Sequence, residues 1–107
     1  MFSISYDDIY LTRGDTAVIN FNLSNYELQD GDTVLLTVKQ SVDTADIAFQ
    51  KVLDKETNQF VIEHNDTKNL PYGKYVYDIQ LTTAQGQVYT IIKPHRFKIE
   101  GEVTWDE

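Results

Sequence analysis

The chain of 107 residues contains no cysteine, so neither disulfide bonds nor thiolate chemistry can contribute to its stability or function. It also contains no apolar run of about 18 residues, and we therefore predict no membrane-spanning helix. Its first ten residues, MFSISYDDIY, lack the basic and apolar regions of a secretory signal, so we expect synthesis in the cytoplasm. From the length and the composition of the chain we expect a single folded domain of ordinary size.

Histidine is scarce, and this limits the chemistry that the chain can perform. Only His64 and His95 are present, whereas a zinc site needs three or four closely arranged ligands. No serine lies in a nucleophile motif such as G-x-S-x-G, and no Ser–His–acid grouping is recognisable. We predict no catalytic residues, no metal ligands and no cofactor, and hence a protein that is not an enzyme.

Closely spaced acidic residues leave calcium binding as an alternative. The pairs are Asp7 with Asp8, Asp30 with Asp32, and Asp43 with Asp46. Calcium takes six to eight oxygen ligands from a loop shaped around it, and Asp30-Gly31-Asp32 is too short to provide them. Aspartate in a turn commonly bonds its own backbone, so we interpret this tripeptide as a turn between strands.

Residues Arg13-Gly14-Asp15 spell the integrin-binding tripeptide. Glycine supplies the backbone freedom that a tight turn needs, and aspartate can cap the turn. We therefore predict a structural turn here rather than an adhesion motif.

Positive charge is also in short supply. The chain has nine Lys and Arg residues and 17 Asp and Glu residues, so its net charge is -8. This charge argues against nucleic acid or an anionic membrane as partner. The imbalance is -6 in residues 1–54 (three against nine) and -2 in residues 55–107 (six against eight). The basic cluster comprises Lys93, Arg96 and Lys98. It has two interpretations: protection of an edge strand, which we favour, or docking against the acidic half of a neighbouring subunit in a homo-oligomer.

The hydrophobic residues that are present alternate with polar ones, which is typical of half-buried β-strands. Turn residues such as Asp30-Gly31-Asp32 separate the alternating runs. The pattern predicts strands at about 2–5, 8–12, 16–23, 33–40, 47–53, 59–64, 73–82 and 87–100. Pro94 interrupts the last strand and favours an edge position with a kink or bulge. Only residues 41–50 could be helical, and their β-branched residues disfavour a long helix.

Seven or eight short strands indicate an all-β fold, either a sandwich or a small barrel, over residues 1–100. Residues 101–107 form a short tail, in which Trp105 either hangs free or docks on a partner. The stretch L70-P-Y-G-K-Y-V-Y-D78 favours the sandwich. Leu70 and the turn glycine Gly73 precede Tyr75 and Tyr77, which share one face of a strand. This is the pattern of a tyrosine corner in immunoglobulin-like domains.

A wider pattern carries a family resemblance. Its elements, in chain order, are L11-T-R-G-D-T16, D30-G-D-T33, Lys51, D66-T67, L70-P-Y-G-K-Y-V-Y-D-I79, T90-I-I92 and F97-K-I-E-G-E-V-T104. Together they resemble the immunoglobulin-like N-terminal domain of phage baseplate upper proteins and related small prophage structural proteins. The resemblance implies an immunoglobulin-like β-sandwich of seven to eight antiparallel strands. It further implies a structural protein of the virion, assembled in the host bacterial cytoplasm, whose partners are other phage tail or baseplate proteins.

A binding module of the same architecture, for carbohydrate or for cell-surface adhesion, is the alternative function. Its contacts would come from exposed aromatic side chains, for which the candidates are Tyr26, Tyr72, Tyr89 and Trp105. Tyr75 and Tyr77 are not among them, because the alternation directs both into the core with Ile79 and Leu81.

Overall fold

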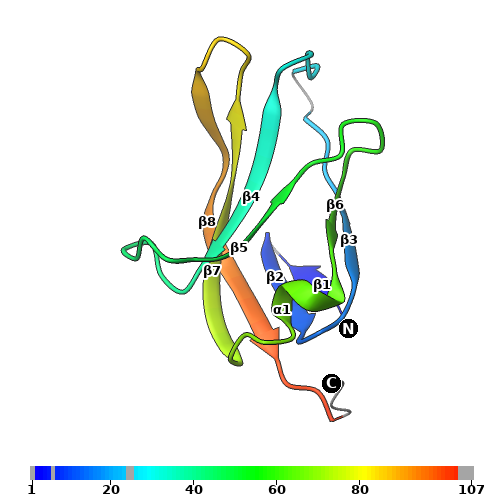
Figure 1. The fold of residues 1–107 in the computed structure, drawn as a ribbon, viewed down its shortest axis with the longest axis vertical. Coiled ribbons are helices and arrows are strands. Elements are labelled where there is room, and N and C mark those ends of the chain that lie inside the picture. Colours follow the sequence, from blue (N-terminus) through cyan, green and yellow to red (C-terminus); the bar gives the residue numbers. More distant parts are fainter. Residues whose placement is uncertain (1, 6, 24–25, 104–107) are drawn as a thin grey trace.

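The computed structural model describes residues 2–5, 7–23 and 26–103, which form an all-β protein (Figure 1). The strands are β1 (Phe2–Ser5), β2 (Asp8–Thr12), β3 (Ala17–Asn20), β4 (Thr33–Lys39), β5 (Ile47–Val52), β6 (Gln59–Ile62), β7 (Gly73–Thr82) and β8 (Val88–Glu100). One short helical turn, α1 (His64–Thr67), separates β6 from β7. None of the described helical residues forms a segment long and apolar enough to cross a membrane.

The predicted strands are all present, but two are shorter than expected. β3 ends at Asn20 rather than 23, and β6 ends at Ile62. The chain turns into α1 because the Asp66 carboxylate accepts a hydrogen bond from the Glu63 backbone N–H at 2.7 Å. The prediction that only 41–50 could be helical was wrong, because this segment forms a turn and the start of β5.

The strands form two sheets. The larger sheet has the order β1-β2-β8-β7-β4-β5, and the smaller sheet pairs β3 with β6. All of these pairs are antiparallel except β2 with β8, which run parallel, and this corrects the expectation of a wholly antiparallel fold. Parallel neighbours need a long connection, and here the intervening strands provide it, since β2 and β8 come from opposite ends of the chain.

Both sheets contribute their inward faces to one hydrophobic core. Figure 1 shows β3 and β6 on one side of the molecule and β4, β7 and β8 on the other. Phe97 of β8 is fully buried, and its ring meets those of Phe49 and Tyr77 edge-on at centroid distances of 5.7 and 6.1 Å. The buried apolar residues are Ile9, Leu11, Ala17, Ile19, Val34, Leu36, Val38, Phe49, Leu53, Phe60, Ile62, Tyr75, Tyr77, Ile79, Leu81, Phe97 and Ile99.

The last strand is an edge strand over only part of its length. Residues 97–100 lie between β2 and β7, so the edge interpretation is wrong for the segment that carries Lys98. Residues 88–96 pair with β7 alone among the described strands. There the register passes from Tyr77–His95 to Ile79–Ile92, which places two residues, Lys93 and Pro94, opposite Asp78. The bulge predicted at Pro94 is therefore present, because proline has no N–H to donate to a ladder.

The central position of Phe97 makes it the most informative core residue to truncate. We expect Phe97→Ala to lower the free energy of unfolding by about 3–5 kcal/mol, because it removes buried surface and leaves a cavity between the sheets. Urea denaturation would measure the loss. The matched control is Val103→Ala, since Val103 is 95% exposed and should change stability by less than about 0.5 kcal/mol. A Phe97→Ala loss as small as the control's would contradict the described core.

Candidate interaction surfaces and buried anchors

Tyr75 and Tyr77 are structural anchors rather than a binding site. They are only 2% and 5% exposed, as the alternation along β7 predicts. The Tyr75 hydroxyl donates a hydrogen bond to the Pro71 carbonyl at 2.8 Å, four residues upstream. The Tyr77 hydroxyl donates to the Asp7 carbonyl in the turn between β1 and β2. Each buried phenol therefore satisfies its polar atom by fixing a turn.

Burial changes the acidity of Tyr77. Loss of solvent around the phenol, and then the nearby carboxylates of Asp7 and Asp8, raise the pKa of Tyr77 to about 12. The charged phenolate is disfavoured both by a low dielectric and by neighbouring negative charge.

The turn Arg13-Gly14-Asp15 is built into the fold. Gly14 has a positive φ of 84°, and its N–H donates to Thr67 Oγ1 at 2.8 Å. The Arg13 guanidinium donates to the Leu70 carbonyl at 3.2 Å and lies 4.1 Å above the Tyr72 ring. Because the Arg13 side chain is only 13% exposed, this tripeptide does not present the arginine that an adhesion motif needs.

Arg13 also holds the start of the C-terminal tail. Its Nε lies 3.3 Å from Glu102 Oε2, and the Tyr72 hydroxyl donates to Glu102 Oε1 at 2.9 Å. Burial alone would raise the pKa of Glu102, but hydrogen bonds from its own backbone, Tyr72 and Arg13 hold it below its usual value. The tail is thus anchored at Glu102. Residues 104–107, including the predicted contact residue Trp105, lie outside the described residues.

Asp32 organises the opposite end of the molecule. Although its side chain is charged, the residue is only 4% exposed. Hydrogen bonds from the Gln29 N–H at 2.9 Å and the Tyr26 hydroxyl at 2.7 Å lower the pKa of Asp32, and the Ala84 N–H adds a third at 3.3 Å. Its oxygens therefore bind loop donors, as the turn interpretation predicts, and do not line an open calcium loop.

The two histidines lie in separate environments. His64 Nδ1 donates to the Gly14 carbonyl at 2.6 Å. His95 Nδ1 lies 3.5 Å from Asp8 Oδ1, and its Nε2 lies 3.9 Å from Asp7 Oδ2. Among residues 7–23 and 26–103, no group of three or more His, Asp or Glu residues is arranged to hold a metal ion.

The aromatic candidates for a sugar-binding surface do not meet in one place. Tyr72 precedes β7 and is engaged by Arg13, whereas Tyr89 pairs with Leu81 toward the far end of β7. A strand rises about 3.3 Å per residue, so these two tyrosines are separated by most of the length of β7. The Tyr26 hydroxyl is bound to Asp32, and Trp105 is outside the described residues.

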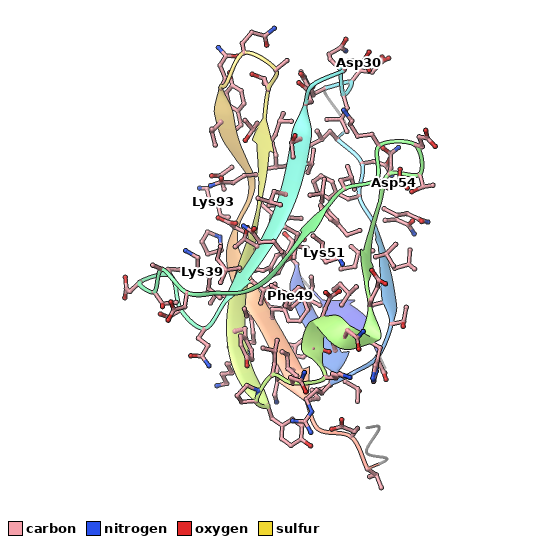
Figure 2. All side chains as sticks on the ribbon, viewed as in Figure 1. Asp30, Lys39, Phe49, Lys51, Asp54 and Lys93 are labelled. Atoms are coloured by element: carbon pink, nitrogen blue, oxygen red, sulfur yellow. The ribbon has the colours of Figure 1, made fainter. Side chains whose placement is uncertain are left out.

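Strand pairing places two further lysines, Lys39 and Lys74, near the basic residues that were predicted as a possible interface. Sequence reasoning found only those close together on β8 and missed Lys39 and Lys74, because strand pairing brings them there from β4 and β7. Figure 2 shows Lys39 and Lys93 on the side of the large sheet that faces away from β3 and β6, whereas Phe49 and Lys51 lie between the sheets. We call this surface the basic face and define it by Lys39, Lys74, Lys93, Arg96 and Lys98.

No protein-family model matches this chain, and no curated protein matches it.

The Tyr75 hydrogen bond makes a specific prediction about stability. We expect Tyr75→Phe to lower the free energy of unfolding by about 1–3 kcal/mol, because it removes one buried hydrogen bond without changing the packed ring. Thermal melting would measure the change, with Tyr89→Phe as the control because Tyr89 is 50% exposed. A Tyr75→Phe melting curve that coincides with the wild type would count against the anchor.

The raised pKa of Tyr77 predicts a loss of stability at alkaline pH. The unfolded chain releases this proton near pH 10 and the folded chain near pH 12, so the contribution is complete below pH 10 and is lost as pH rises to 12. We expect about 1–2 kcal/mol, reduced from the full linkage value by solvent screening. Urea denaturation between pH 9 and 12 should show a steeper loss for wild type than for Tyr77→Phe. Parallel curves would refute the assignment.

Proposed function

We propose that this chain is a structural protein of a phage or prophage virion, a tail or baseplate component with an immunoglobulin-like β-sandwich fold. It acts through protein–protein contacts and not as an enzyme. Its partners are other tail or baseplate proteins, and its place is the virion, assembled in the host bacterial cytoplasm.

The strand order supports the immunoglobulin-like part of the proposal. In variable-type immunoglobulin domains one sheet contains strands G, F, C and C′, while B and E belong to the other sheet. The order β8-β7-β4-β5 corresponds to G-F-C-C′, and the pair β3-β6 corresponds to B and E. The core shared by the two sheets is the interior that a sandwich requires.

The observation that carries the proposal is the geometry of residues 70–79, the longest element of the family resemblance. Gly73 begins β7 with a φ of 141°, and Tyr75 bonds back to Pro71, as a tyrosine corner does. Tyr77 stands at the buried position two residues later, where antibody domains carry a cysteine. The residues that suggest the phage family are therefore the same residues whose geometry supports a tyrosine corner.

The charge and the buried networks favour a role in contacts over one in chemistry. Arg13, Asp32 and His64 are each bonded to turns or loops, so these polar side chains hold the ends of the sheets in place. The basic face and the loops at the sheet ends remain as surfaces for partners. A rigid module with such surfaces fits a repeated assembly.

The virion role can be tested directly on particles. We expect peptides of this chain in phage particles that are induced from the source bacterium and purified by density gradient, at a constant ratio to a tail protein. Mass spectrometry would measure the ratio, and immunogold labelling should place the chain at the tail or baseplate. An abundant host cytosolic protein is the contamination control. If the chain follows that control and disappears from washed particles, the virion role is refuted.

A further inference from the structure

Most of the Lys and Arg residues without an acidic partner among the described residues lie on one surface. Five of its nine Lys and Arg residues belong to the basic face defined above. Two others have acidic partners, since Arg13 contacts Glu102 and Lys51 Nζ lies 3.0 Å from Asp66 Oδ2. Within the part of the chain that the structure describes, no ion pair includes a residue of the basic face.

The register places these cations close to one another. Lys74 lies directly opposite Lys98, and Arg96 lies opposite Val76, whose neighbour on the other side is Lys39. Like charges directly opposite each other on a sheet are destabilising. Asp8, Asp78 and Glu100 share this side of the strands, and the Arg96 N–H donates to Asp8 Oδ1 at 3.1 Å. Five cations and three carboxylates therefore leave a local charge of +2 on a chain of net charge -8. An arrangement that opposes stability indicates a partner with negative charge.

A groove in the same face indicates that this partner is a protein. It has a volume of about 310 Å³, and its floor includes the apolar side chains of Leu35, Val76 and Pro94. Val42 and Ile47 border it and are 62% and 49% exposed. An apolar centre with a charged rim is typical of protein interfaces, whereas a nucleic acid would be held mainly through its phosphates.

The molecule itself carries a complementary surface. Lys55 Nζ bonds the carbonyls of Asp32 at 2.9 Å and Gln29 at 3.3 Å, so the loop before β4 and the turn before β6 are joined. These segments expose four carboxylates and form what we call the acidic end: Glu27, Asp30, Asp54 and Glu56. Figure 2 shows Asp30 and Asp54 away from Lys39 and Lys93. One copy therefore offers both surfaces at once.

We propose that a second copy of this chain docks its acidic end onto the basic face. The contact is head-to-side, so a bound pair still has one free basic face and one free acidic end, and the assembly grows into a ring or a filament. The overall repulsion between two acidic chains is screened beyond about 8 Å at physiological salt, whereas the complementary charges act at contact. The inference rests on the proposed role in a repeated virion structure and names the first partner within it.

Sedimentation velocity of the purified chain tests the proposal. At about 150 mM salt and high protein concentration we expect species heavier than the monomer, which return to monomer at about 500 mM salt because the contact is electrostatic. Lys74→Glu should abolish association at the lower salt concentration. Its melting temperature should equal or exceed that of wild type, since Glu opposite Lys98 replaces a repulsive pair with an attractive one. The charge-matched control is Lys68→Glu, on the C-cap of α1, which should associate as wild type does.

Charge exchange between the two surfaces makes the test specific. Lys74→Glu with Arg96→Glu changes the net charge of the basic face from positive to negative. Asp30→Lys with Glu56→Lys changes the acidic end, counted with Lys55, from -3 to +1. Each double variant alone should be monomeric, and mixing the two should restore association, because each surface then meets its complement on the other variant.

The proposal is overturned if the wild type stays monomeric at the lower salt concentration, if Lys68→Glu disrupts association as strongly as Lys74→Glu does, or if mixing the two double variants restores nothing. It is also overturned if the monomer binds a labelled single-stranded oligonucleotide through Lys74 without associating with itself. If the chain does not associate with itself but is found in phage particles, only the proposed contact between copies is refuted, and the virion role stands. If the chain associates with itself but is absent from phage particles, only the virion role is refuted.

Discussion

Burial of two tyrosines on one face of β7 is the constraint on which much of this structure depends. A buried phenol needs a partner for its hydroxyl, and neither Tyr75 nor Tyr77 finds one within its own sheet. The Tyr75 hydroxyl donates to the Pro71 carbonyl and thereby fixes the turn that precedes β7. Tyr77 takes the Asp7 carbonyl and thereby fixes the turn between β1 and β2. The longest inward-facing run of the core and two of its turns are therefore stabilised by the same side chains.

Charged side chains stabilise the two ends of the molecule in a similar way. Arg13 joins the turn after β2, the segment before β7 and the start of the tail. Asp32 joins the loop before β4 to the turn after β7 through backbone N–H groups. Because both are largely shielded from solvent and hydrogen-bonded, they connect loops more firmly than surface ion pairs would. The function of these residues is structural, which separates them from the charges on the basic face.

The distribution of charge then has a simple interpretation. A high net negative charge keeps separate copies soluble and opposes nonspecific contact with nucleic acid. In the contact that we propose between two copies, the local positive charge on the outer side of the large sheet offsets that repulsion. For the proposed virion component, such a charge distribution would also disfavour wrong contacts, because most other surface pairs repel each other.

The all-β class, the approximate strand positions and the inward direction of Tyr75 and Tyr77 were all predicted from the sequence. Alternation is a local property, since neighbouring residues on a strand point to opposite faces whatever lies beside them. The bulge at Pro94 was predicted for the same reason, because a missing N–H belongs to the residue itself. The short helix α1 was missed, since it depends on the hydrogen bond between Glu63 and Asp66 in a segment with no helical period.

Only the tertiary structure decided which strands became neighbours. The parallel pairing of β2 with β8 removes residues 97–100 from the edge of the sheet, and nothing in either segment alone indicates that partner. The pairing of β4 with β7 and of β7 with β8 brings Lys39 and Lys74 beside Arg96 and Lys98. The pairing of β2 with β8 brings Arg13, which follows β2, to Tyr72 and Glu102. The sequence by itself determined the secondary structure and the buried face of each strand, because both follow from short-range periodicity. The surfaces that can meet a partner were decided by contacts between residues far apart in the chain, which periodicity does not encode.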